Sequence, residues 1–109
     1  MKSFNEWLNE ARSTDGYFYR NRRVICSDGF SISIQANEAA YCSPRENIED
    51  IAEYNSFELG FPSAKDNQIM EYSEDAEDPT GTVYGYVPRE LVEKLIESHG
   101  GISELKQRY

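Results

Sequence analysis

The segment over residues 22–35 limits the fold more strongly than any other part of the sequence. Residues 30–35, Phe-Ser-Ile-Ser-Ile-Gln, alternate strictly between apolar and polar side chains. Such alternation predicts a strand with one buried and one solvated face, which is typical of an antiparallel sheet. Residues 22–26 are rich in β-forming side chains, and Ser27-Asp28-Gly29 has the composition of a tight turn. The sequence therefore predicts an antiparallel hairpin.

Two further strands are expected in the second half of the chain. Residues 56–61 place Phe57, Leu59 and Phe61 on one side, and Pro62 ends the pattern. Residues 82–87, Thr-Val-Tyr-Gly-Tyr-Val, form the other strand. Its glycine, Gly85, leaves a gap that another backbone or side chain can approach closely.

Two amphipathic helices are predicted, one near each end of the chain. Residues 3–12 place apolar side chains on one helical face, and Ser3 with Glu6 fits a capping box. A second helix follows Pro88 with a stripe formed by Leu91, Val92, Leu95 and Ile96. Gly100 is expected to cap this helix in the left-handed conformation, with Ile102 packing back on the stripe.

The remaining segments carry weaker patterns. Residues 36–47 indicate a loop, residues 47–54 a short helix, residues 62–81 an irregular surface excursion, and residues 103–109 a final turn or a frayed tail. A chain of 109 residues with 13% aromatic residues has the length and composition of one folded domain. We therefore expect a single α+β domain over residues 1–109, with a three- to four-stranded, largely antiparallel sheet and both helices packed on its apolar face.

No segment resembles a signal peptide or a membrane span. We therefore expect a cytoplasmic protein with no membrane partner. In that compartment the two cysteines, Cys26 and Cys42, are expected to be reduced thiols.

Negative charge is concentrated in the middle of the chain. The formal net charge is −9, and residues 46–78 contain eleven acidic side chains against one basic side chain, Lys65. Direct binding to nucleic acid or to an anionic lipid surface is disfavoured, whereas a basic protein partner is favoured. We expect the carboxylates of this segment to share one open surface and to bind that partner, with Tyr54 and Tyr72 as aromatic anchors. The acidic residues assigned to this surface are Glu49, Asp50, Glu53, Glu71, Glu74, Asp75, Glu77 and Asp78.

A small enzyme or ligand-binding domain is the alternative interpretation. Its first candidates are Cys42, the more exposed of the two cysteines by this interpretation, Arg45, which would stabilise a thiolate, and His99, the single histidine. Cys26 ends a strand and is expected in the core, and His99 lies where it would interact with a helix dipole. No metal-ligand or cofactor motif is present, so we predict neither a metal site nor a cofactor.

Four segments resemble a group of small phage and prophage proteins: residues 28–36, residues 41–45 (Tyr-Cys-Ser-Pro-Arg), residues 83–88 and residues 99–102 (His-Gly-Gly-Ile). The resemblance covers most of the chain from Cys26 to Ile102 and transfers no catalytic residue. It implies an early or accessory factor that acts on a bacterial host protein, which agrees with the non-enzymatic binding protein that the charge pattern predicts. One such class comprises inhibitors of CRISPR or restriction enzymes, several of which are acidic mimics of nucleic acid.

Two other interpretations stay open. The protein is a structural or self-assembling phage component in one of them. In the other, Arg20, Arg22 and Arg23 form a basic patch that pairs with the acidic segment of a second copy, which produces a homodimer.

Overall fold

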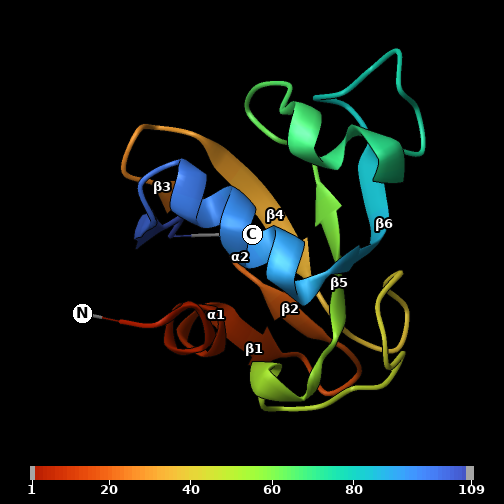
Figure 1. Ribbon diagram of the computed structural model, residues 1–109. Helices are drawn as coiled ribbons and strands as arrows, with labels where there is room; N and C mark the ends of the chain where they lie inside the picture. Colours follow the sequence, from red (N-terminus) through yellow and green to blue (C-terminus); the bar gives the residue numbers. More distant parts are fainter. Residues whose placement is uncertain (1, 108–109) are drawn as a thin grey trace.

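The protein is an α+β domain built on a five-stranded antiparallel sheet. A computed structural model describes residues 2–107, and its sheet has the order β6-β5-β4-β3-β7 (Figure 1). The strands are β3 (Val24–Cys26), β4 (Ser31–Gln35), β5 (Ser56–Gly60), β6 (Val83–Pro88) and β7 (Ile102–Leu105). The α+β class and the antiparallel pairing are confirmed, but the sheet is larger than the three or four strands predicted.

The predicted hairpin is present as β3 and β4, with Val24 paired to Ile32. Ile32 and Ile34 are fully buried, and the polar residues that alternate with them line the opposite face of the sheet. The alternation therefore identified both faces of β4 correctly. The strands β5 and β6 also match their predicted segments to within one residue at each end.

The prediction of a turn or frayed tail is wrong for residues 103–105, which together with Ile102 belong to a strand. They form the edge strand β7, which pairs antiparallel to β3 with Val24 opposite Leu105. The reason is tertiary, because a four-residue strand with Ser103 and Glu104 is stable only against a partner distant in sequence. Residues 108 and 109 lie outside the described part of the chain.

Helix α2 (Arg89–Ser98) lies across the buried face of the sheet (Figure 1). It ends as predicted, because the N–H groups of Gly100 and Gly101 donate to the carbonyls of Glu97 and Ile96, a Schellman cap with both glycines at positive φ. Neither helix in residues 2–107 has the length and apolar sequence that a bilayer span requires.

Helix α1 (Phe4–Ala11) begins with the predicted capping box between Ser3 and Glu6. However, the elements that it packs against most closely are β2 (Tyr19–Asn21), β7 and η1 (Ile51–Glu53), a 3-10 turn. It therefore closes one side of the core, and the prediction that both helices cover the sheet face is correct only for α2.

A second, two-stranded sheet was not expected from the sequence. It pairs β1 (Arg12–Thr14) with β2, and the Gln35 side chain links it to the main sheet. The backbone N–H of Asn21 donates to Oε1 of Gln35 at 2.9 Å, and Nε2 of Gln35 donates to the Asn21 carbonyl at 2.7 Å. An amide side chain thus replaces a backbone pair between the two sheets.

The predicted helix over residues 47–54 is wrong, because only η1 is helical there. Two arginines fix this segment instead. Arg12 donates to the Ile48 carbonyl, and Arg89 donates to the carbonyls of Ile51 and Tyr54. Side chains thus satisfy backbone carbonyls that a helix would have satisfied internally.

The excursion over residues 62–81 is more ordered than expected. It contains η2 (Asn67–Tyr72), a 3-10 helix whose Ile69 is fully buried in the core. Figure 1 shows η2 and the loop that follows it at the far end of β5 and β6 from η1.

Candidate functional site

The acidic residues expected to share one surface are divided between two ends of the molecule. Glu49, Asp50 and Glu53 lie at η1, which packs against α1, whereas the other five follow the core residue Ile69 and lead into β6 (Figure 1). The strand β5 runs between these two regions. The expectation of one continuous acidic face over residues 46–78 is therefore wrong.

The larger group forms a coherent unit, which we call the acidic lobe, residues 71–81. Its exposed carboxylates belong to Glu71, Glu74, Asp75, Glu77 and Asp78. None of these five side chains forms an ion pair with a basic group of residues 2–107. The lobe therefore presents negative charge that the described chain does not neutralise.

The acidic lobe is attached firmly to β6. Ser73 forms an antiparallel bridge with Tyr84, and the N–H of Glu74 donates to the Val83 carbonyl at 3.0 Å. The buried Tyr84 donates its hydroxyl to the Pro79 carbonyl at 2.6 Å. These contacts fix both ends of the loop, so its charges have defined positions.

The smaller acidic group is partly structural. Asp50 caps η1 by accepting the Ala52 N–H at 3.0 Å, and it also accepts a hydrogen bond from Asn9. Hydrogen bonds from Ala52 and then Asn9 lower the pKa of Asp50. Glu49 and Glu53 are exposed.

The two predicted aromatic anchors are not both available. Tyr54 is fully buried, and its hydroxyl binds the Glu46 carbonyl, the Ile48 N–H and the Arg12 guanidinium. Its assignment to a binding surface is therefore wrong. Tyr72 is half-buried and packs against the core. The exposed aromatic residue next to the lobe is Phe61, whose N–H donates to the Thr82 carbonyl.

The structure does not bring the three residues of the enzymatic alternative together into one site. Cys42, expected to be the more exposed thiol, is fully buried, and its Sγ lies 3.3 Å from the Asn37 carbonyl. Desolvation raises its pKa despite the opposing hydrogen bond and the nearby Arg45. Burial likewise raises the pKa of Cys26, which lies in the core as expected, to about 11. Arg45 lies near enough to oppose the rise at Cys42, but its guanidinium lies against the Tyr41 ring. No hydrogen bond or ion pair among residues 2–107 joins His99 to Cys42 or Arg45, because its ring nitrogens lie against Asp28 and Asp66.

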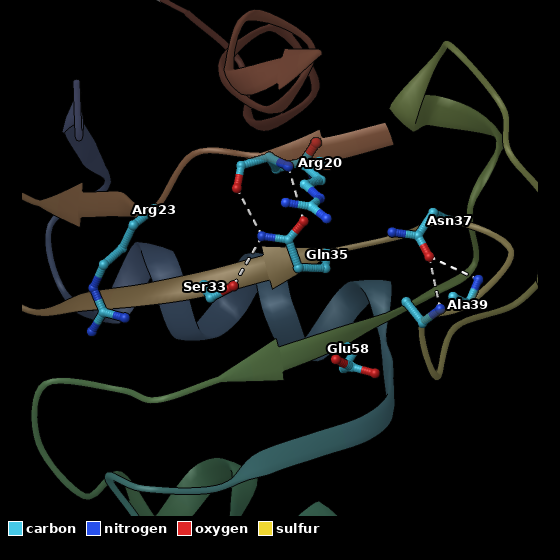
Figure 2. Close-up of a pocket in the computed structure, with 9 residues that line it drawn as sticks. Arg20, Arg23, Ser33, Gln35, Asn37, Ala39 and Glu58 are labelled. Atoms are coloured by element: carbon cyan, nitrogen blue, oxygen red, sulfur yellow. Dashed lines mark hydrogen bonds between the residues drawn. The ribbon is translucent and has the colours of Figure 1, made fainter. Parts of the chain in front are cut away.

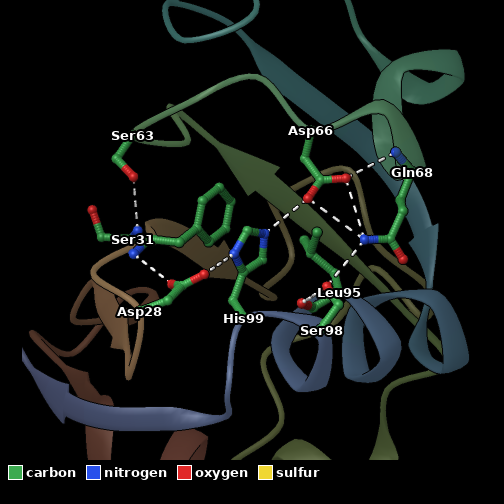
Figure 3. A network of polar contacts seen from close by, with 9 residues as sticks. Asp28, Ser31, Ser63, Asp66, Gln68, Leu95, Ser98 and His99 are labelled. Atoms are coloured by element: carbon green, nitrogen blue, oxygen red, sulfur yellow. Dashed lines mark hydrogen bonds and ion pairs between the residues drawn. The ribbon is translucent and has the colours of Figure 1, made fainter.

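His99 lies between two carboxylates rather than only at a helix end. Its Nδ1 is 2.7 Å from Asp28 and its Nε2 is 2.8 Å from Asp66, while its ring stacks on Phe30 with centroids 3.9 Å apart (Figure 3). Desolvation lowers the pKa of His99, but the two carboxylates outweigh it and raise the pKa overall. Both ring nitrogens are occupied, so the ring has none free to act as a base toward a substrate.

The open face of the main sheet, opposite α2, contains a polar hollow of about 410 Å³ (Figure 2). The side chains that define it are Arg20, Arg23, Ser33, Gln35, Asn37 and Glu58. Arg23 donates to the Ser31 side chain and to the carbonyls of Ser31 and Phe61. Neither Arg20 nor Arg23 forms an ion pair with a carboxylate of residues 2–107.

Exposed aromatic residues lie next to residues of this hollow, although none of them lines it. Tyr41 receives support from Glu58, whose Oε2 accepts the Tyr41 N–H at 2.8 Å, and its ring stacks with Tyr86 at a centroid distance of 6.0 Å. A Cβ atom at Gly85 would lie 3.2 Å from the Tyr41 Cβ, so the predicted gap at this glycine is occupied by Tyr41. On the other side, Phe61 contacts Arg23 through its carbonyl.

Two of these aromatic residues have unusual backbone conformations. Phe61 has a φ of 50° and Tyr86 a φ of 54°, in the left-handed region that favours glycine. At Tyr86 the register of β5 and β6 shifts, which places an extra residue in β6 and turns the tyrosine outward. Such conformations persist where the surrounding structure enforces them, and they occur often at functional sites.

Comparison of the chain with known protein families, curated protein sequences and solved structures gives no match. The functional argument therefore rests on the geometry of the molecule. In residues 2–107, no group of three or more histidine, cysteine or acidic side chains is arranged to bind a metal ion.

Sequence reasoning missed the hollow as a site. It identified the outward residues of β4 and the arginines at 20–23, but not their convergence with Glu58 and Tyr41. Strand pairing between distant segments brings these residues together. The one sequence pattern that indicated the hollow was the alternation of polar residues along β4, which predicted an exposed polar face.

Proposed function

We propose that this protein is a non-enzymatic binding protein that recognises a basic protein surface through the acidic lobe. The observation that carries the proposal is the set of five exposed carboxylates of the acidic lobe, which is attached to β6 and forms no ion pair with the rest of residues 2–107. Charge of one sign on a fixed scaffold accelerates encounter with an oppositely charged partner and restricts its orientation. Phe61, at the base of the lobe, supplies the aromatic contact assigned earlier to Tyr54 and Tyr72.

The partner class follows from this charge. A protein that binds nucleic acid presents lysine and arginine side chains spaced to contact phosphates. Carboxylates at fixed positions can occupy those basic sites in place of phosphates. We therefore propose that the lobe competes with nucleic acid for such a partner, as an inhibitor of a phage-directed defence enzyme in a bacterial cytoplasm would.

The structure supplies a matched pair of variants for the test. Glu74→Lys/Glu77→Lys reverses two charges of the lobe, and Glu49→Lys/Glu53→Lys makes the same change of net charge at η1. We would immobilise each protein, expose it to bacterial lysate at low and high salt, and identify the retained proteins by mass spectrometry.

We expect the wild type and the η1 variant to retain a basic nucleic-acid-binding protein at low salt, and the lobe variant to lose it. Duplex DNA should release the captured protein from the wild type. Equal capture by the wild type and the lobe variant would contradict the proposal, and so would loss of capture in both variants.

A further inference from the structure

The polar hollow has chemistry that the proposed function does not use. Arg20 and Arg23 line it and form no ion pair with a carboxylate among residues 2–107, although Asp15 lies near enough to Arg20 for the guanidinium to contribute to its lowered pKa. Glu58 contributes the opposite charge on another side, and its Oε2 already accepts the Tyr41 N–H. The hollow is therefore a weakly cationic site on a strongly acidic protein.

Guanidinium groups in this setting favour carboxylates. Arginine offers planar, bidentate donors that match a carboxylate, and such pairs are stronger than hydrogen bonds between neutral groups. Ser33 and Gln35 add hydroxyl and amide groups to the same surface. A ligand that carries carboxylates thus fits the charge of the hollow.

The surface next to the hollow favours a protein ligand over a free small anion. Among the described residues, Tyr41, Phe61 and Tyr86 are three of four exposed large apolar side chains, with exposed fractions of 41%, 49% and 47%. They do not line the hollow, but Tyr41 and Phe61 hydrogen-bond to its residues Glu58 and Arg23 through their backbones, and Tyr86 stacks on Tyr41. Clusters of exposed aromatic side chains are typical of protein-binding surfaces, where the partner covers the rings.

We propose that the hollow binds the acidic lobe of a second copy of this chain, so that the protein forms a homodimer. The lobe offers the carboxylates that the hollow lacks, and the contacts of Glu74 and Tyr84 attach it to β6 of its own molecule. Because a two-fold arrangement uses each contact twice, the arginines of each hollow meet the lobe carboxylates of the other copy. Arg20 offers the freer guanidinium, since Nε and Nη2 of Arg23 already donate to Ser31 and Phe61. The proposal goes beyond the binding of a basic partner, which would compete for the same lobe.

The net charge of each copy does not prevent this contact. At physiological ionic strength the Debye length is about 8 Å, so repulsion between two molecules of charge −9 is largely screened. Ion pairs in direct contact between the two copies are partly buried by that contact and are therefore screened less.

Charge-swap complementation tests the dimer directly. We would measure the association of the full-length chain by sedimentation velocity from low to high micromolar concentration. Arg20→Glu changes the hollow, and Glu74→Lys/Glu77→Lys changes the lobe. We expect the wild type to dimerise and the dimer dissociation constant of each variant alone to rise by about tenfold or more. An equimolar mixture of the two variants should dimerise again.

The control is Lys94→Glu, which makes the same charge change as Arg20→Glu on the exposed side of α2 and should leave the dimer intact. A wild type that stays monomeric at every concentration would overturn the proposal, as would a mixture that stays monomeric. Arg20→Glu also separates the two functions, because it retains the lobe. A monomeric wild type that captures a basic partner would refute the dimer and leave the proposed function standing.

Discussion

At the scale of single residues, the contacts of His99 join three parts of the fold. Asp28 belongs to the β3–β4 turn, Asp66 caps η2, and His99 itself is the C-cap of α2. Because an ionised carboxylate only accepts hydrogen bonds, both ring nitrogens of His99 must be protonated to donate to these partners. Below its pKa, which the carboxylates raise above the usual 6.5, the ring that makes both contacts is an imidazolium, and its charge then helps to join these three parts of the fold.

The stability of the protein should consequently fall as the pH rises through the pKa of His99. That pKa is raised above 6.5 in the folded state, so the stabilisation is complete below the unfolded value and is lost above the folded one. The pKa values of Asp28 and Asp66 are lowered below 3.8, so their contribution is lost in acid. Stability should be greatest between about pH 4 and 6.5.

Urea unfolding of the wild type and of His99→Gln measures this dependence. The free energy of unfolding of the wild type should fall as the pH rises above the pKa of His99, whereas that of the variant should stay constant over the same range. Parallel profiles for the two proteins between about pH 5 and 8 would show that the imidazolium does not contribute.

At the scale of secondary-structure elements, η2 determines where the acidic lobe lies. Its residue Ile69 is fully buried, and Gln68 donates to Asp66 and to Ser98 on α2. A six-residue 3-10 helix has little stability of its own, so these tertiary contacts fix it. The position of the lobe is thus fixed by the packing of η2 against the core.

Truncation of the Ile69 side chain should therefore lower the stability of the protein. Ile69→Ala should lower the free energy of unfolding by about 2–5 kcal/mol, as expected for a large-to-small change at a buried site. Hydrogen exchange should accelerate most at the Glu74 amide, which donates to Val83. Ala76, which is exposed within the lobe, offers the control Ala76→Gly. A loss at Ile69 no larger than that of the control would contradict this account.

The elements that the sequence predicted well are those with local signals. The alternation over residues 30–35, the Ser3–Glu6 capping box and the glycines after α2 depend on neighbouring residues, and all three appear in the structure. The strand β7 and the open-face hollow depend on pairing between distant segments, which no local pattern encodes. Tyr54 and Cys42 were misplaced for a related reason, because polar neighbours in the sequence concealed their burial.

At the scale of the whole molecule, the uneven charge distribution carries an energetic consequence. The described ion pairs involve Lys2–Glu10, Arg89–Glu93 and the two contacts of His99, and none reaches the lobe. Repulsion within a protein of net charge −9 opposes the compact state, and it is strongest where the carboxylates cluster.

Reversal of lobe charges should therefore stabilise the isolated protein slightly. Each Glu→Lys substitution adds two charge units, so Glu74→Lys/Glu77→Lys reduces the net charge from −9 to −5. At low ionic strength the midpoint of thermal unfolding should rise, and the free energy of unfolding should increase by about 0.5 kcal/mol or less. Both increases should become smaller as the salt concentration rises. Lys94→Glu, which adds negative charge, should shift the midpoint the other way. A lower midpoint for the lobe variant would instead indicate that its carboxylates make stabilising contacts.

The attachment of the loop to β6 through Tyr84 and Ser73 has a thermodynamic consequence for recognition. A flexible acidic tail would surrender conformational entropy on association, which weakens its affinity per contact. In this protein that ordering is completed during folding, so the lobe is preorganised. A partner should meet it as a rigid template with a defined spacing of charges and should discriminate against polyanions of the same total charge but different shape.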